Sequence, residues 1–171
     1  MLIAFAKWAA VALALSAVVA FAAALTGHKV FRAELTIAAP PEAVWAVLMD
    51  TEAYAQWNVV FVEVQGDYAE GKTLVQKVRE PNGTLHTMKA RVKTLRPGAE
   101  LRQTGGALGI LTFDHSWRLT PVANGTRVVQ EDVNRGIAMW FWDSSWVEPA
   151  YAAANQALAQ RVQALAAQPR R

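Results

Sequence analysis

The amino end of the chain is one long apolar run. Between Trp8 and Leu25 the only polar side chain is that of Ser16. A run of at least about 18 apolar residues is long enough to cross the roughly 30 Å hydrocarbon core of a bilayer as a helix. The pattern therefore predicts an N-terminal transmembrane helix, which we assign to residues 1–27.

A cleaved signal peptide is the alternative interpretation of this run. The small residues at positions 22–24 resemble the cleavage site that follows the apolar core of a signal peptide. The apolar core of such a peptide is usually about 7 to 15 residues long, so the length of the run favours an anchor. Lys7 stands on one side of the run against Lys29 and Arg32 on the other, and this even split leaves the side of the membrane open.

Beyond residue 28, apolar and polar positions alternate, which is typical of half-buried strands. The first such segment covers residues 31–37, and about six more follow in hairpin succession. Asn-Gly steps at 82–83 and 124–125 indicate tight turns, because both central positions of a type I′ turn need positive φ. Both steps also begin Asn-Gly-Thr, a glycosylation acceptor pattern that matters only in a eukaryotic secretory route, so we prefer the turn interpretation.

Two short amphipathic helices interrupt the strands. Pro41 suits the first position of a helix that carries Trp45, and Thr51 can cap a second helix that carries Trp57. Helices of barely two turns are not stable alone in water. Their aromatic faces are therefore expected to close over a larger body.

The last element is a long helix in an alanine-rich background. Its apolar positions recur on one helix face at Tyr151, Ala154, Leu158, Val162 and Leu165. An antiparallel sheet with one hydrophobic face needs such a helix to cover it. The order of elements predicts an α+β domain over residues 28–171.

Composition narrows the possible partners. The 171 residues include no cysteine, 53% are hydrophobic and 18% are charged. Residues 29–171 keep 16 of the 17 basic residues and all 14 acidic ones, so this part is nearly neutral. No basic run with interleaved aromatic residues occurs, which argues against a nucleic-acid partner.

Several landmarks in residues 31 to about 167 resemble one known superfamily in their order and spacing. They are Ala39-Pro40, Glu42, Val44-Trp45, Asp50, Tyr54, Trp57-Asn58, the run 115–121, Gly125-Thr126-Arg127, Glu131, Gly136 and the run 155–158. The chain resembles the START and birch-pollen-allergen (SRPBCC) superfamily, in its polyketide cyclase/dehydrase-like branch. The resemblance implies a helix-grip fold, a curved antiparallel sheet wrapped around a long C-terminal helix with a cavity between them. Members of the superfamily bind lipids, sterols, polyketides or plant hormones, and a few are cyclases or hydrolases.

The alternation of side chains between the two faces of a strand identifies the polar residues that are candidates for chemistry in the interior. Phe113, His115 and Trp117 share an apolar face that we assign to the interior. Across the hairpin at 124–125, the set that contains Glu131 is the more apolar one, so we expect Glu131 to point inward toward His115. A carboxylate at that place would raise the pKa of the histidine, whereas burial would lower it, and our hypothesis is that the carboxylate dominates. A structural pair without chemistry is the alternative, because most buried polar pairs are structural.

The predicted ligand-binding residues lie on the inner faces of the strands and on the covering helices. They are Trp45, Trp57, Gln76, His86, Met88, Ala90, Gln103, Phe113, His115, Trp117, Glu131 and Tyr151. The candidates for catalysis are His115, Glu131 and His86. An apolar pocket with a few convergent polar groups is the usual form of a small-molecule site.

Other sites are disfavoured. Three histidines at positions 28, 86 and 115, without cysteine or close spacing, do not suit zinc, and we expect no metal and no cofactor. Ser144 and Ser145 lack the G-x-S-x-G context of a serine hydrolase. The aromatic cluster of Trp140, Phe141, Trp142 and Trp146 has three possible roles, namely core packing, a pocket mouth or a membrane-interface belt.

The sequence therefore predicts a single-pass membrane protein whose domain binds a hydrophobic small molecule or lipid. One alternative is a polyketide cyclase/dehydrase-like enzyme that uses His115 and Glu131. The other is a protein-interaction module.

Overall fold

The structure is a computed structural model and describes residues 2–168. Met1 and residues 169–171, at the outer ends of the predicted 1–27 and 28–171 segments, lie outside the described residues. The helices are α1 (Leu2–Thr26), α2 (Pro41–Met49), η1 (Thr51–Ala53), α3 (Tyr54–Trp57), η2 (Ile137–Trp140) and α4 (Val147–Ala166). The strands are β1 (His28–Ile37), β2 (Phe61–Gln65), β3 (Thr73–Arg79), β4 (Leu85–Arg96), β5 (Glu100–Ala107), β6 (Leu111–Val122) and β7 (Gly125–Arg135).

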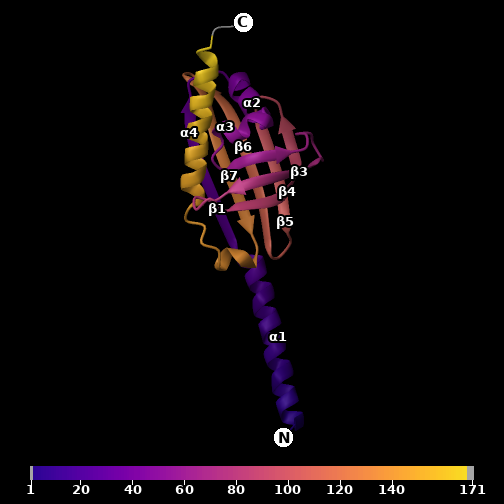
Figure 1. Cartoon of the computed structure of the whole chain (residues 1–171). Coiled ribbons are helices and arrows are strands. Elements are labelled where there is room, and N and C mark those ends of the chain that lie inside the picture. The colour runs from indigo at the N-terminus through magenta and orange to yellow at the C-terminus, as the bar shows by residue number, and fades with distance from the viewer. Residues whose placement is uncertain (1, 169–171) are drawn as a thin grey trace.

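The strands form one antiparallel sheet of seven strands in the order β1-β7-β6-β5-β4-β3-β2. The sheet curls around α4, which lies along its concave side (Figure 1). This arrangement confirms the predicted helix-grip fold. The chain does reverse at both predicted Asn-Gly steps, with positive φ at Gly83 and Gly125, but Asn82 and Asn124 do not have positive φ, so the expectation of type I′ turns is wrong.

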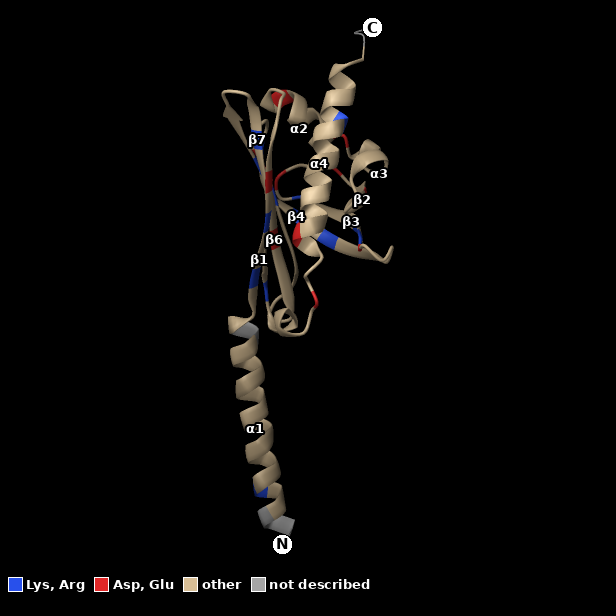
Figure 2. Cartoon of the chain, turned by 90° about the vertical axis from the view of Figure 1, so that its left-hand side faces the viewer, with Lys and Arg blue, Asp and Glu red and all other residues tan. Residues whose placement is uncertain are grey.

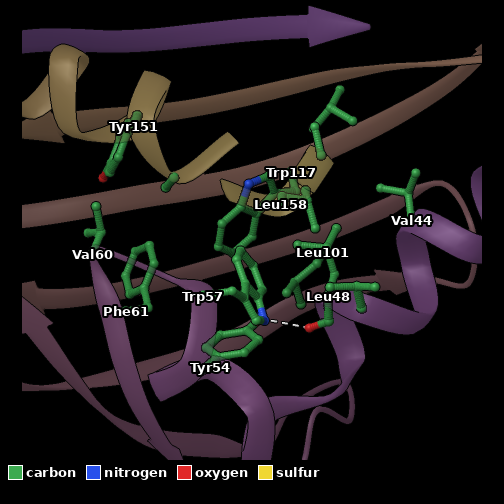
Figure 3. Packing of buried hydrophobic residues seen from close by; sticks show 14 of the residues in the cluster. Val44, Leu48, Tyr54, Trp57, Val60, Phe61, Leu101, Trp117, Tyr151 and Leu158 are labelled. Carbon is green, nitrogen blue, oxygen red and sulfur yellow. Dashed lines mark hydrogen bonds between the residues drawn. The ribbon is translucent and has the colours of Figure 1, made fainter. Parts of the chain in front are cut away.

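The core lies between the sheet, α4 and the short helices. Its inner β6 positions are Phe113, His115, Trp117 and Leu119, as parity predicts. Four of the apolar positions predicted on the last helix are buried, and only Leu165 is partly exposed. Figure 3 shows Trp57, Trp117, Leu101 and Leu158 packed together, with the buried Tyr54 hydroxyl donating to the Leu48 carbonyl at 2.6 Å.

Helix α2 explains why Trp45 misses the interior. Its buried residues are Val44, Val47 and Leu48, which follow the i, i+3, i+4 stripe of one helix face. Trp45 lies beside that stripe, is half-buried and lines a shallow surface hollow with Met49 and other residues. The expectation that Trp45 closes the cavity is therefore wrong.

Helix α1 projects away from the domain (Figure 1). Residues Phe5–Ala23 have a mean hydropathy of 1.9, long and apolar enough to cross a membrane, and large apolar side chains along them are exposed. Apart from Lys7 near its N-terminal end, α1 carries no charge (Figure 2).

Candidate functional site

A cavity of about 450 Å³ lies between the curled sheet and the N-terminal half of α4. Predicted residues that line it are Gln76, His86, Met88, Phe113, His115 and Tyr151. Lining residues not predicted are Val60, Phe61, Val78, Glu80, Leu111, Asp132, Asn134, Ala138, Trp142, Trp146 and Val147. Most of this wall is apolar.

Four predicted residues lie in the packed core and not on the cavity wall. Trp57, Ala90, Gln103 and Trp117 are each at most 8% exposed. The Gln76 amide donates to the Gln103 carbonyl oxygen at 3.3 Å, so Gln103 supports a lining residue from behind. Replacement of Ala90 would therefore disturb core packing before it filled the cavity.

Glu131 does not point inward, and this expectation is wrong. Arg118 donates to its Oε1 at 3.1 Å, and Arg32 lies 3.5 Å from its Oε2, both on the outer face of the sheet. Its neighbour on β6 is Ser116, which also faces outward. The predicted pair of His115 and Glu131 therefore does not form.

The turn between β6 and β7 gives the reason. Val122 pairs with Gly125, which leaves a two-residue loop. In such a hairpin, directly opposite residues always have one odd and one even number. Opposite residues share a face, so the odd-numbered inner set on β6 requires an even-numbered inner set on β7.

The inner face of β7 is accordingly polar. Asp132 lies directly opposite His115, and Asn134 lies opposite Phe113. Both are buried, as is Gln130. The pattern of apolar residues in the sequence indicates the wrong face of β7 as the inner one, because the true inner face has a lower apolar content than the outer face.

Two hydrogen bonds organise the polar end of the cavity. The Tyr151 hydroxyl, from α4, donates to Asp132 Oδ2 at 2.9 Å. The Gln130 amide donates to His115 Nε2 at 3.0 Å, which places the proton of a neutral imidazole on Nδ1. This end of the cavity therefore joins two strands and the covering helix.

Four buried polar atoms of inner β6 and β7 residues have no hydrogen-bond partner among residues 2–168. They are His115 Nδ1, Asp132 Oδ1, Asn134 Nδ2 and Gln130 Oε1. Buried polar atoms are normally hydrogen-bonded. His115, Asp132 and Asn134 line the cavity, so two unpartnered donors and an unpartnered acceptor belong to residues of its wall.

Burial controls the protonation of this cluster. Burial lowers the pKa of His115, and the opposing effects of Asp132 and Asp114 are smaller. The hypothesis that a carboxylate dominates is therefore wrong. Burial also raises the pKa of the Tyr151 hydroxyl well above its ordinary value, so Tyr151 remains a donor.

His86 is the third predicted catalytic candidate and lies at the rim. Its side chain is 56% exposed, and its Nε2 lies 2.8 Å from Glu80 Oε1. His86 therefore borders the opening of the cavity rather than its polar end.

The aromatic cluster before α4 divides into two parts. Trp142 and Trp146 line the cavity, and Trp142 packs edge-on against Phe31 at a centroid distance of 6.0 Å. Trp140 and Phe141 are exposed. Within residues 2–168, no group of three or more His, Asp or Glu side chains is placed to hold a metal ion.

Three solved structures illustrate the similarity of the fold. A protein from Nitrosomonas europaea has a TM-score of 0.66 at 15% identity, covering 81% of this chain and 97% of that one. A protein from Chromobacterium violaceum has a TM-score of 0.63 at 23% identity, covering 79% and 98%. The Zhui aromatase/cyclase from a Streptomyces species has a TM-score of 0.64 at 18% identity, covering 80% and 94%. At these identities the similarity establishes the fold alone.

Sequence comparison gives the family. No curated protein matches the chain. The model of one family, described as polyketide cyclase/dehydrase and lipid transport, matches residues 28–163, which include every strand and nearly all of α4. A helix-grip domain with a cavity, matched over most of its length, makes this chain a member of the polyketide cyclase/dehydrase and lipid transport family.

Proposed function

We propose that this protein is a membrane-anchored binding protein for a hydrophobic small molecule or lipid that carries a hydroxyl group. The observation that carries the proposal is an apolar cavity whose wall includes three residues with buried, unpartnered polar atoms, namely His115, Asp132 and Asn134. In this proposal residues 1–27 are the anchor and residues 28–171 are the binding domain.

The size and walls of the cavity favour an apolar ligand. Ligand cavities usually measure about 300 to 1,000 Å³, and this one measures about 450 Å³. Val60, Phe61 and Trp146 are among the apolar residues of its wall. Each Å² of apolar surface that a ligand buries there contributes about 25 cal/mol before the costs of binding.

The polar end favours a hydroxyl group on that ligand. Asp132 Oδ1 can accept a hydrogen bond, while Asn134 Nδ2 and His115 Nδ1 can donate one. A hydroxyl group both donates and accepts, so one such group can satisfy Asp132 together with either donor. A plain hydrocarbon would leave all three atoms unsatisfied, which is unfavourable for buried groups.

The anchor is supported by the apolar residues 5–23, whose side chains lie outside the domain. A cleaved signal peptide would give a mature protein that begins near Leu25. N-terminal sequencing of the protein from membranes distinguishes the two. Recovery of the intact amino end would support the anchor, and a mature end near Leu25 would contradict it.

Binding of 2-naphthol and naphthalene to the full chain in lipid nanodiscs tests the ligand chemistry. The two probes share a ring system and differ by one hydroxyl group. We expect 2-naphthol to bind about 2- to 13-fold more tightly, as one net hydrogen bond of about 0.5 to 1.5 kcal/mol predicts. Equal affinity for both probes, or binding of neither, would contradict the proposal.

Matched variants locate the effect. Asp132→Asn should remove most of the preference for 2-naphthol, because the replaced oxygen is the acceptor that we assign to the ligand. Glu131→Gln changes the next residue on the outer face of the same strand and should leave both affinities unchanged. Turnover of a substrate that disappears in His115→Gln would instead favour an enzyme.

A further inference from the structure

Four large apolar side chains are exposed at the end of the domain where α1 joins it. They are Leu108 (95% exposed), Ile110 (61%), Trp140 (61%) and Phe141 (83%), which we call the apolar tip. Neither the core nor the cavity accounts for them. Exposed apolar patches of this kind mark surfaces that contact a partner or a membrane.

The apolar tip is a single unit built from two segments. Leu108 and Ile110 lie in the turn between β5 and β6, whereas Trp140 and Phe141 lie in and just after η2. Ile137 donates its backbone N–H to the Gly109 carbonyl at 3.0 Å, and Ala138 donates to the Ile110 carbonyl at 3.0 Å. These bonds hold the two segments side by side.

The apolar tip is also joined to the end of α1. Gly136 donates its N–H to the Gly27 carbonyl at 2.9 Å. A Cβ atom on Gly27 would lie 2.1 Å from the Gly136 carbonyl oxygen, so this contact requires glycine. The Trp140 indole N–H donates to the Ala23 carbonyl at 3.1 Å, which sets Trp140 beside the last turn of α1.

Ala23 is the last residue of the apolar stretch that could span a membrane. At 1.5 Å per residue, 19 helical residues cover about 28 Å, close to the roughly 30 Å thickness of the hydrocarbon core. If Phe5 lies at one boundary of that core, Ala23 lies at the other. Trp140 then lies at the level of the lipid headgroups, where tryptophan is enriched because its ring is amphipathic.

The charge distribution agrees with this position. Residues 104–113 and 136–142, which contain the apolar tip, include no Asp, Glu, Lys or Arg. The nearby Lys29 ammonium is held by two hydrogen bonds within the domain, which it donates to the Trp142 carbonyl at 3.0 Å and to Ser144 Oγ at 2.9 Å. These two segments can therefore enter a membrane interface without desolvating a charge.

We infer that the apolar tip lies in the interface of the same bilayer that α1 crosses, and that its partner is the boundary between lipid headgroups and acyl chains. The inference rests on the proposed anchoring by α1. Leu111 and Ala138 line the cavity and are close in sequence to Ile110 and Trp140. The wall of the cavity therefore continues into the two segments that form the tip, and in this inference an apolar ligand enters the cavity from the bilayer on this side.

Site-specific fluorescence in the full chain tests the inference. The sequence has no cysteine, so a single introduced cysteine can carry an environment-sensitive nitrobenzoxadiazole label. Labels are placed at Phe141→Cys and, independently, at Leu108→Cys. The protein is reconstituted into phosphatidylcholine vesicles with and without lipids that carry a doxyl quencher at carbon 5.

Two control positions separate the possible failures. Leu13→Cys lies in the middle of α1, and Gln163→Cys lies exposed near the far end of α4 (Figure 1). We expect blue-shifted and quenched emission at Leu13, Phe141 and Leu108, and neither effect at Gln163. Quenching at Leu13 but at neither tip position would overturn the inference while leaving the anchor intact. Absence of quenching at Leu13 would overturn the anchor itself and the inference with it.

Discussion

Removal of the Tyr151 hydroxyl tests the polar end of the cavity most sharply. Tyr151 is 5% exposed and Asp132 is 8% exposed, and the hydroxyl donates to Asp132 Oδ2 at 2.9 Å. Because Asp132 Oδ1 has no partner, Tyr151→Phe would leave this carboxylate without a side-chain donor among residues 2–168. A hydrogen bond to a charged group contributes about 1.5 to 3 kcal/mol, so we expect a loss of that size in the free energy of unfolding.

The same change at Tyr54 is the matched control. Tyr54 is also buried, but its hydroxyl contacts only neutral groups, because it donates to the Leu48 carbonyl at 2.6 Å and lies 3.4 Å from the Tyr68 hydroxyl. A neutral hydrogen bond contributes about 0.5 to 1.5 kcal/mol, so Tyr54→Phe should cost less than Tyr151→Phe.

Thermal unfolding of the full chain in detergent micelles measures both effects. In a domain of this size, each kcal/mol lowers the melting temperature by roughly 2 to 4 °C. A double-mutant cycle of Tyr151→Phe with Asp132→Asn isolates the interaction. Additive effects in that cycle, or a smaller loss for Tyr151→Phe than for Tyr54→Phe, would refute the reasoning.

Three further predictions concern protonation, the outer face and the turn beside α1. Burial lowers the pKa of His115 below 6.5, so the free energy of unfolding should fall as the pH drops below 6.5, by at most about 1.4 kcal/mol per pH unit. His115→Gln should remove this dependence on pH. An unchanged slope in denaturant titrations of the variant would contradict the prediction. Glu131→Gln should cost no more than about 1 kcal/mol because its ion pairs are partly solvated, and a larger loss by the same titration would place Glu131 in the interior. Gly136→Ala should destabilise more than Gly83→Ala, since both have positive φ but only the first would bring a Cβ within 2.3 Å of the Ile110 carbonyl; equal melting temperatures would exclude that contact.

The fold was predictable from the sequence because its signals are local and repeated. Alternation in the strands, the chain reversals near the two Asn-Gly steps and the apolar stripe of the last helix each depend on near neighbours. Together with the order and spacing of the landmark residues that resemble the superfamily, they predict a curved sheet around α4, which the structure confirms.

The inner face of β7 was predictable from turn geometry but not from apolar content. A two-residue loop pairs His115 with an even-numbered residue, and that rule alone places Asp132 inside. The apolar content of β7 points to Glu131 instead, because the outer face carries Val129 and Val133. Inner strand faces that carry polar residues break the usual pattern of apolar residues inside, and such local inconsistencies are expected at functional sites.

The division of the aromatic cluster depends on tertiary contacts that sequence spacing does not contain. Trp142 lies inside, where it packs edge-on against Phe31. Trp140 is exposed, and its indole N–H donates to the Ala23 carbonyl near the end of α1. Both contacts join segments more than 100 residues apart, so no local pattern could separate the two tryptophans.

Native mass spectrometry of the full chain, extracted with detergent, is the most direct test of the proposed binding function. Met88 lines the cavity, so Met88→Trp should fill ligand volume, whereas Thr87→Trp places the same ring on the exposed side of the same strand. We expect a retained hydrophobic molecule in the wild type and in Thr87→Trp, and its loss in a folded Met88→Trp. Equal retention in Met88→Trp, or no retained molecule in the wild type, would contradict it.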